Sequence, residues 1–183
     1  MIPLLNKLPT LDKGYVALLS STNDAQKLRD ILPYISNQSL SKELDISSMT
    51  LLVKCPLFVQ LHLSQHSLTI LNTRLQEELE AFIPNETEIG SPDLENNRLI
   101  SDDVKRTTEA LLINPSAYQS DGCDRFISQV LTPISTYTTI IVHGTRRNWL
   151  SLLSQDNLPY PINCYQKTID KIYNAEWNDG SST

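Results

Sequence analysis

The 183-residue sequence has few of the residues that build phosphate-binding loops and cross-linked folds. Its 5 glycines are isolated from one another, which excludes the glycine-rich fingerprints of P-loop and dinucleotide-binding proteins. Its 3 cysteines lie far apart and form no CxxC pair, which argues against a disulfide framework and a thiolate zinc site. We expect Cys55, Cys123 and Cys164 to be small buried side chains.

Long apolar runs are also missing. No stretch of eighteen apolar residues occurs, so the sequence predicts no membrane span. The first residues contain Pro3 and Pro9 and lack a small-residue cleavage site after a long apolar core, which is a poor match to a secretory signal. A cytoplasmic protein is the expectation that follows.

Positive charge is scarce as well. The formal net charge is −6, whereas a protein that binds nucleic acid non-specifically needs a basic surface that displaces counterions. Arg146 and Arg147 form a basic cluster, but it is too small for that role. We therefore expect no nucleic-acid partner, although a local anion site stays open.

Motifs for covalent or metal chemistry are absent. The sequence has no GxSxG, and no cysteine lies in a pattern with a nearby base. His62 and His66 have the four-residue spacing of two zinc ligands on a helix, but no third acid or histidine follows nearby. We expect no metal site, and a structural or solvent-facing role for His62.

The periodicity that is present predicts an α+β protein. We expect strands at 15–19, 46–55 and 135–143, the last β-branched almost throughout. Helices are expected at 25–32, 56–66, 72–82, 101–113, 124–131, 146–155 and 163–177, with a loop at 83–100. The strands do not alternate evenly with helices, which favours a mostly antiparallel sheet flanked by helices. One domain over residues 1–183 is expected, with a loose arm at 1–14 and a loose tail at 178–183.

The junction of the 135–143 strand with the next helix is a candidate binding site. Free N–H groups at a helix start, together with Arg146 and Arg147, would attract an anion such as a phosphate. Alternatively, Thr145 caps the helix and both arginines face water. The sequence leaves both interpretations open.

Two blocks of the sequence resemble one known family. Residues 55–59, CPLFV, followed by Gln65-His66-Ser67, resemble the flavin-dependent thymidylate synthases, which carry APIFVARQW(F/V)RHR at this point. Residues 132–138, TPISTYT, are similar to the family's LPxSTYT, and residues 144–150 are similar to its tGxLRNxxHFL. The resemblance implies an α+β homotetramer with active sites between subunits that hold FAD, dUMP and a methylene-folate. A phage genome would suit such a small diverged copy.

The resemblance also shows what this sequence lacks. The first Arg, the His and the second Arg of the RHR motif correspond to Gln65, His66 and Ser67. The motif's Asn survives as Asn72, and the Arg of LRN survives as Arg147. Other family positions hold Ile46, Ile70, Thr73, Leu75, Glu77, Glu78 and Gln129, and less securely Asp156 and Gln166, in place of the expected polar or cationic residues.

Loss of several cations together favours a non-catalytic homologue, because an Arg–phosphate fork is bidentate and charge-assisted and cannot be replaced by Gln or Ser. In this interpretation the oligomeric scaffold serves for binding or interaction, and no cofactor is expected. The alternative is an active FAD-dependent enzyme that methylates dUMP to dTMP with methylene-tetrahydrofolate. The remnant nucleotide or flavin site would then consist of His66, Asn72, Arg146 and Arg147, and an unrelated α+β domain is the third possibility.

Overall fold

The computed structural model describes residues 6–11, 13–22, 47–73, 80–89, 92–120 and 133–177. The chain divides into two compact units. The first unit consists of Met1–Cys55, Val59–Leu75 and Thr139–Thr183, and the second consists of Pro56–Phe58 and Gln76–Thr138. The expected helices at 25–32 and 124–131 and the expected tail lie outside the described residues. A single domain over the whole chain stays a prediction.

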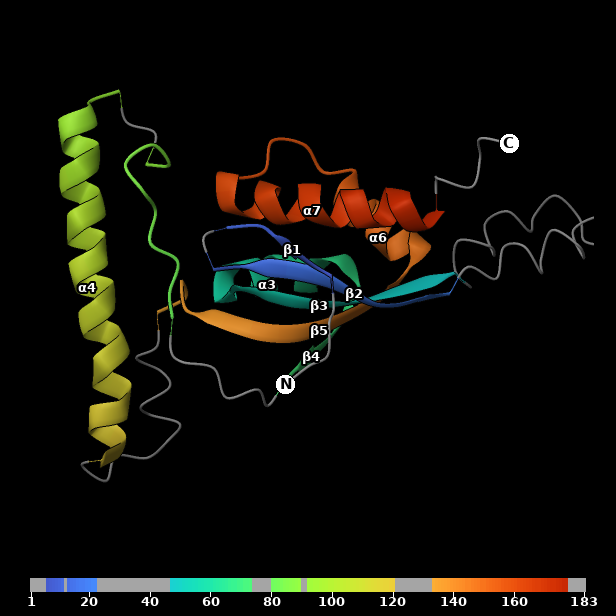
Figure 1. Ribbon diagram of the computed structural model, residues 1–183, viewed down its shortest axis with the longest axis horizontal. Coiled ribbons are helices and arrows are strands. Elements are labelled where there is room, and N and C mark those ends of the chain that lie inside the picture. The colour runs from blue at the N-terminus through green and yellow to red at the C-terminus, as the bar shows by residue number, and fades with distance from the viewer. Residues whose placement is uncertain are drawn as a thin grey trace, which may run out of the picture. The chain divides into compact units, whose positions relative to one another are not determined.

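A five-stranded sheet is the centre of the fold (Figure 1). Its strands are β1 (Lys7–Pro9), β2 (Tyr15–Thr22), β3 (Ser48–Pro56), β4 (Thr69–Asn72) and β5 (Tyr137–Thr145). They are arranged in the order β1-β2-β3-β5-β4. The strand β3 is central and nearly all of its side chains are buried or half-buried, as its two apolar faces predict.

All neighbouring strands run antiparallel. The pairs β1–β2, β2–β3 and β4–β5 are antiparallel in register, with one irregularity of β2 between Leu18 and Ser20. For β3 and β5, the N–H of Arg146 donates to the carbonyl of Ser47, and Thr50 bonds with His143. The partner number falls as the residue number rises, so this pair is antiparallel too. The prediction of an α+β fold with a mostly antiparallel sheet is confirmed.

The N-terminal arm was expected to be loose, and for its middle part this is wrong. Residues Lys7–Pro9 form the edge strand β1, whose Lys7, Leu8 and Pro9 face Ala17, Val16 and Tyr15. The edge position explains why Pro9 is tolerated, because a proline cannot donate to a second neighbouring strand. Residues 1–5 lie outside the described part of the chain.

Three helical segments complete the first unit. The short helix α3 (Leu57–Leu63) continues as one 3₁₀ turn, η3 (Ser64–His66), and leads into β4. The helix α6 (Arg146–Leu153) follows β5 directly, and α7 (Tyr160–Trp177) runs along the sheet next to β2 (Figure 1). The helix α3 was expected to begin at Pro56, but Pro56 is the last residue of β3.

The core of the first unit lies where α6 and α7 meet β3. Trp149 of α6 is fully buried, and its indole N–H donates to the carbonyls of Met49 and Gly144. Tyr165 of α7 donates its hydroxyl to the carbonyl of Lys54 at 2.8 Å. Two aromatic side chains therefore join α6 and α7 to the backbone of the sheet by hydrogen bonds. The buried residues of α7 are Tyr165, Thr168, Ile169, Ile172, Tyr173 and Trp177.

In the second unit, the helix α4 (Leu94–Ser120) is longer than predicted. The carboxylate of Asp93 accepts from the N–H groups of Glu95 and Asn96, which is the geometry of a helix N-cap. The predicted loop is confirmed for the described residues 83–89 and 92–93, but it is wrong from Leu94 onward, and the predicted helix start at Ser101 is wrong because Asp93 supplies the cap eight residues earlier.

The expected helix over 72–82 is also wrong where it is described. Asn72 ends β4, and Ala81 forms a β-bridge with Thr136.

Among the described residues, no helix is long and apolar enough to cross a membrane.

Candidate functional site

The segment that carries His66 is a tight link between α3 and β4. Leu63 and His66 are buried, whereas Gln65 and Ser67 on either side of His66 are exposed. The chain leaves η3 through Ser67, which adopts the left-handed conformation with φ 55° and ψ 26°. This turn sends Leu68 back into the core and leaves the imidazole inside the protein.

His66 packs against a second histidine. The ring centroids of His62 and His66 are 5.1 Å apart in an edge-to-face arrangement. Burial lowers the pKa of both imidazoles, and the proximity of His66 lowers the pKa of His62 further. Both effects favour the neutral form of the rings. The Nε2 atom of each is buried and has no hydrogen-bond partner.

One amide side chain lies beside His66, and another links α3 to β4. The Gln60 amide donates to the side-chain oxygen of Asn72 at 3.1 Å and so joins α3 to the end of β4. Gln155, just after α6, lies close enough to His66 to oppose the lowering of its pKa. The Oε1 atoms of Gln60 and Gln155 are buried without a hydrogen-bond partner, like both imidazole nitrogens. We call His62, His66 and Gln155 the polar cluster.

The start of α6 is capped by its own residues. Thr145 and Asn148 form a reciprocal capping box, in which Thr145 Oγ1 accepts from the Asn148 N–H and the Asn148 side chain accepts from the Thr145 N–H. The Arg146 N–H donates to Ser47 at 2.7 Å. Three N–H groups that could have bound an anion are therefore occupied.

The two arginines at this helix start differ in their surroundings. The Arg146 Nε donates to the Tyr173 hydroxyl at 3.0 Å, and its guanidinium lies beside the rings of Tyr173 and Trp177. Arg147 is exposed. The prediction that Thr145 caps the helix is confirmed, and the prediction that both arginines face water is wrong for Arg146.

The C-terminal end of α6 is closed by Gln166 of α7. Its amide donates to the carbonyls of Leu152, Leu153 and Gln155. His66 lies near this end through Gln155, whereas Arg146 lies at the other. An eight-residue helix is about 12 Å long. The structure therefore places His66 beside Gln155 and Asn72 beside Gln60, and it places Arg146 and Arg147 at the other end of α6 from Gln155.

Comparison with known proteins finds a solved structure with the same fold. A solved structure of a UMP/dUMP methylase, PolB from Streptomyces cacaoi bound with 5-Br UMP, matches 89% of this chain and 89% of that chain. The TM-score is 0.69 at 17% identity. The chain shares the fold of this methylase. No family model matches the sequence, and no curated protein matches it.

The sequence indicated His66 and Asn72 as candidate site residues, but it did not indicate Gln60 and Gln155, which contact Asn72 and His66. Gln60 and Gln155 carry no motif, and Gln155 lies 89 positions from His66 in the sequence. A spacing of four residues did mark His62 and His66 as neighbours on one helical face. The aromatic environment of Arg146 had a similar signal, since Tyr173 and Trp177 are four residues apart on α7.

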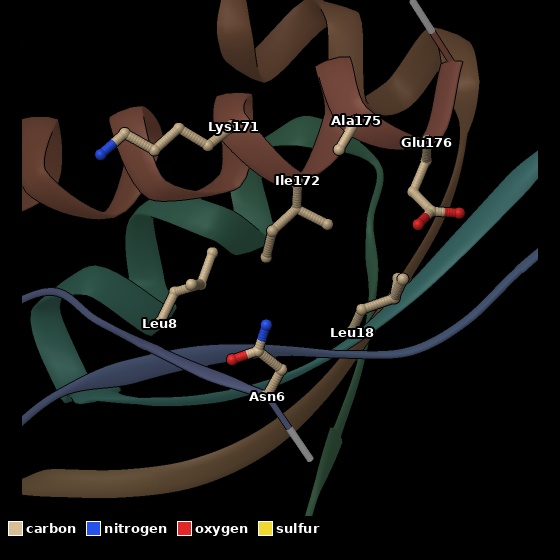
Figure 2. Close-up of a pocket in the computed structure, with 7 residues that line it drawn as sticks. All are labelled: Asn6, Leu8, Leu18, Lys171, Ile172, Ala175 and Glu176. Carbon is tan, nitrogen blue, oxygen red and sulfur yellow. The ribbon is translucent and has the colours of Figure 1, made fainter. Parts of the chain in front are cut away.

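A separate cavity lies between α7 and the first two strands (Figure 2). Its volume is about 230 Å³, and Figure 2 shows Ile172 pointing from α7 toward the strands while the amine of Lys171 turns away. The Ser21 hydroxyl donates to the Glu176 carboxylate at its border. The lining residues are Asn6, Leu8, Leu18, Lys171, Ile172, Ala175 and Glu176. The mostly aliphatic lining offers no reactive group.

Metal and thiol chemistry find no support in the described residues. No group of three or more His, Cys, Asp or Glu side chains that could hold a metal ion occurs among them. Cys55 and Cys164 are free, and burial raises the pKa of the Cys55 thiol far above its ordinary value. Cys55 is thus the unreactive buried side chain that was expected, whereas the prediction is wrong for Cys164, which is only half-buried, and Cys123 lies outside the described residues.

Proposed function

We propose that the chain is a diverged homologue of the flavin-dependent thymidylate synthases that lacks synthase activity and acts as an oligomeric binding or interaction scaffold. The surroundings of His66 carry this proposal. In the family motif this histidine has an arginine on each side, whereas here the exposed neighbours are Gln65 and Ser67. A phosphate or a flavin pyrophosphate bound there would lose its charge-assisted hydrogen bonds.

The two remaining cations of the predicted site do not compensate. Arg146 and Arg147 both lie at the far end of α6 from His66, and Arg146 is bonded to Tyr173. The loss of cations also removes the electrostatic stabilisation that a transition state with developing negative charge needs. The shared methylase fold supports a retained scaffold, and the unpartnered atoms of the polar cluster support a retained capacity to bind a neutral polar group.

The alternative is an active enzyme that uses FAD and methylene-tetrahydrofolate to methylate dUMP to dTMP. Two observations favour it over other enzymatic functions. The solved structure that shares this fold is described as a UMP/dUMP methylase with a bound uridine nucleotide analogue. His66 and Asn72 also stand where the family motif places them, and the His66 Nε2 has no partner.

Spectroscopy and an activity assay separate the two functions. We expect the purified protein to show no flavin absorbance in the visible range, to bind neither FAD nor dUMP in calorimetry, and to form no dTMP. Co-purified flavin, dTMP formation or rescue of a thymidine-auxotrophic strain would contradict the proposal and establish the alternative.

A gain-of-function variant tests the reason for the lost activity. Gln65→Arg combined with Ser67→Arg restores the two cations of the motif, and we expect it to bind dUMP or FAD measurably. Ser64→Arg is the matched control, because Ser64 is exposed in the same 3₁₀ turn and lies outside the two motif positions. Binding by the control variant but not by the double variant would refute the assignment of these positions.

The scaffold part of the proposal has its own measurement. Light scattering should give a mass about four times the chain mass of 20.7 kDa. A monomer at all concentrations would refute an oligomeric scaffold while leaving the shared fold untouched.

A further inference from the structure

A second candidate ligand site lies at the N-terminal end of α6, where Arg146 meets the last two turns of α7. The Arg146 Cζ atom is 5.9 Å from the ring centroid of Tyr173 and 5.8 Å from that of Trp177. The two rings are themselves in edge-to-face contact, with centroids 4.6 Å apart. The Tyr173 hydroxyl accepts from Nε. The guanidinium is thus held in one place by three contacts while its side chain stays partly exposed.

The charge of Arg146 is not neutralised by a carboxylate in the described part of the chain. Its partners among the described residues are the Tyr173 hydroxyl, two aromatic rings and, through the backbone, Ser47. The neighbouring acid on α7, Glu176, instead accepts from Ser21. Nε uses one of the five guanidinium N–H donors, so four remain at the two terminal nitrogens.

A buried donor without an acceptor belongs to the same group of side chains. Trp177 is 8% exposed, and its indole nitrogen has no hydrogen-bond partner. An indole N–H can only donate, so its missing partner must be an acceptor. Ser47, whose carbonyl binds the Arg146 N–H at 2.7 Å, adds a fully buried hydroxyl that also has no partner.

These side chains share one requirement, which is an acceptor carrying negative charge. We propose that Arg146, Tyr173 and Trp177 form a binding site for a small oxyanion, either a carboxylate or a phosphate group. The guanidinium fork matches the paired oxygens of such a group. The Trp177 ring lies close to the guanidinium, and in the proposed site its unpartnered N–H donates to a second oxygen of the same anion.

This site is distinct from a helix N-terminal anion site, because the capping box and Ser47 already occupy the first N–H groups of α6. It is also independent of the proposed function. A protein without synthase activity and an active synthase could both hold an oxyanion at Arg146, since His66 lies at the other end of α6.

Calorimetric titration of the full chain at low ionic strength tests the proposal, with inorganic phosphate and acetate as separate ligands. We expect saturable binding of one of them. Trp177→Phe keeps a ring but removes the N–H donor, and it should weaken binding about tenfold, the usual effect of one hydrogen bond to a charged group. Arg146→Gln should weaken binding about a hundredfold or more.

Arg98→Gln is the matched control, because Arg98 is exposed on α4 and its loss changes the net charge equally. It should leave the affinity unchanged. Thermal unfolding of each variant shows whether it folds, and the milder Trp177→Phe keeps the test decisive if Arg146→Gln does not.

The ligand that binds more tightly identifies the class, phosphate for a phosphate ester and acetate for a carboxylic acid. Three results would overturn the proposal: no saturable binding of either ion at millimolar concentration, equal weakening by Arg98→Gln, or an unchanged affinity in Trp177→Phe. Flavin binding and dTMP formation are measured separately, so failure here does not affect the proposed function.

Discussion

The start of α6 and the segment around His66, which both lie in stretches that carry the family resemblance, differ in the hydrogen bonding of their polar groups. At the start of α6, Thr145 and Asn148 satisfy each other, and Gln166 covers three carbonyls at the end of the helix. Around His66, by contrast, three side-chain atoms are buried without a partner: the Nε2 atoms of His62 and His66 and the Oε1 atom of Gln155. The capping residues of α6 thus supply each other's hydrogen-bond partners, whereas the polar cluster lacks them.

This difference separates a structural element from a candidate binding element. A buried polar atom without a hydrogen bond costs about 1–3 kcal/mol, and several together are tolerated where another molecule supplies the missing partners. The polar cluster therefore remains the better candidate for contact with a ligand or a second chain, even though its flanking cations are gone. The segment just after α6 contacts the polar cluster through Gln155, which lies beside His66.

The largest effect is expected at the junction that makes α6 structural. Trp149→Ala removes a fully buried side chain and both of its hydrogen bonds to the sheet and to Gly144. We expect a loss of about 3–5 kcal/mol in the free energy of unfolding, measured by urea denaturation. Trp149→Phe, which keeps a ring but no N–H, should lose less. If Trp149→Ala unfolds at the same urea concentration as the parent, α6 is not anchored as described.

The cap of α6 should contribute less. Thr145→Ala removes the hydroxyl that accepts from the Asn148 N–H, and it should lower the free energy of unfolding by about 1 kcal/mol. Thr145→Ser keeps an acceptor and serves as the control. Equal stability of all three proteins in urea would show that the capping box does not stabilise this helix.

The sequence predicts the elements with strong local signals and fails where the decisive contact is distant. Alternation and β-branching predict β3 and β5, and the Thr145 cap is a local pattern. The start of α4 was placed at Ser101 because its Ser-Asp-Asp run looks like a cap, but Asp93 was equally suited. The polar cluster could be predicted only in part, since Gln155 reaches His66 through tertiary folding and carries no signal of its own.

Acid should destabilise the protein through the polar cluster. The pKa values of His62 and His66 are lowered in the folded protein, whereas in the unfolded chain they are near 6.5, about the ordinary value. Below that pH the unfolded chain binds more protons, so the free energy of unfolding falls until the folded pKa values are reached. Because His62 is partly exposed, we expect the fall to be smaller than the effect of Thr145→Ala.

Urea denaturation at about pH 7 and about pH 5 measures this pH dependence. The double variant His62→Gln, His66→Gln should flatten it. His143→Gln, which removes an exposed histidine on β5, is the control and should keep it. An unchanged slope in the double variant would assign the acid sensitivity to other groups.

The smallest effect is expected at Ser67, next to the polar cluster. A non-glycine residue in the left-handed conformation bears a strain of about 1 kcal/mol, and glycine costs about 0.5 kcal/mol in conformational entropy. Ser67→Gly should therefore stabilise the protein by about 0.5 kcal/mol in urea denaturation. Asn157→Gly is the matched comparison, because Asn157 has φ 59° but asparagine tolerates this conformation better. A gain larger at Ser67 than at Asn157 would show that the left-handed conformation strains the serine more than the asparagine. A loss at Ser67 would show that its hydroxyl stabilises the turn and that the motif's arginine cannot simply be restored.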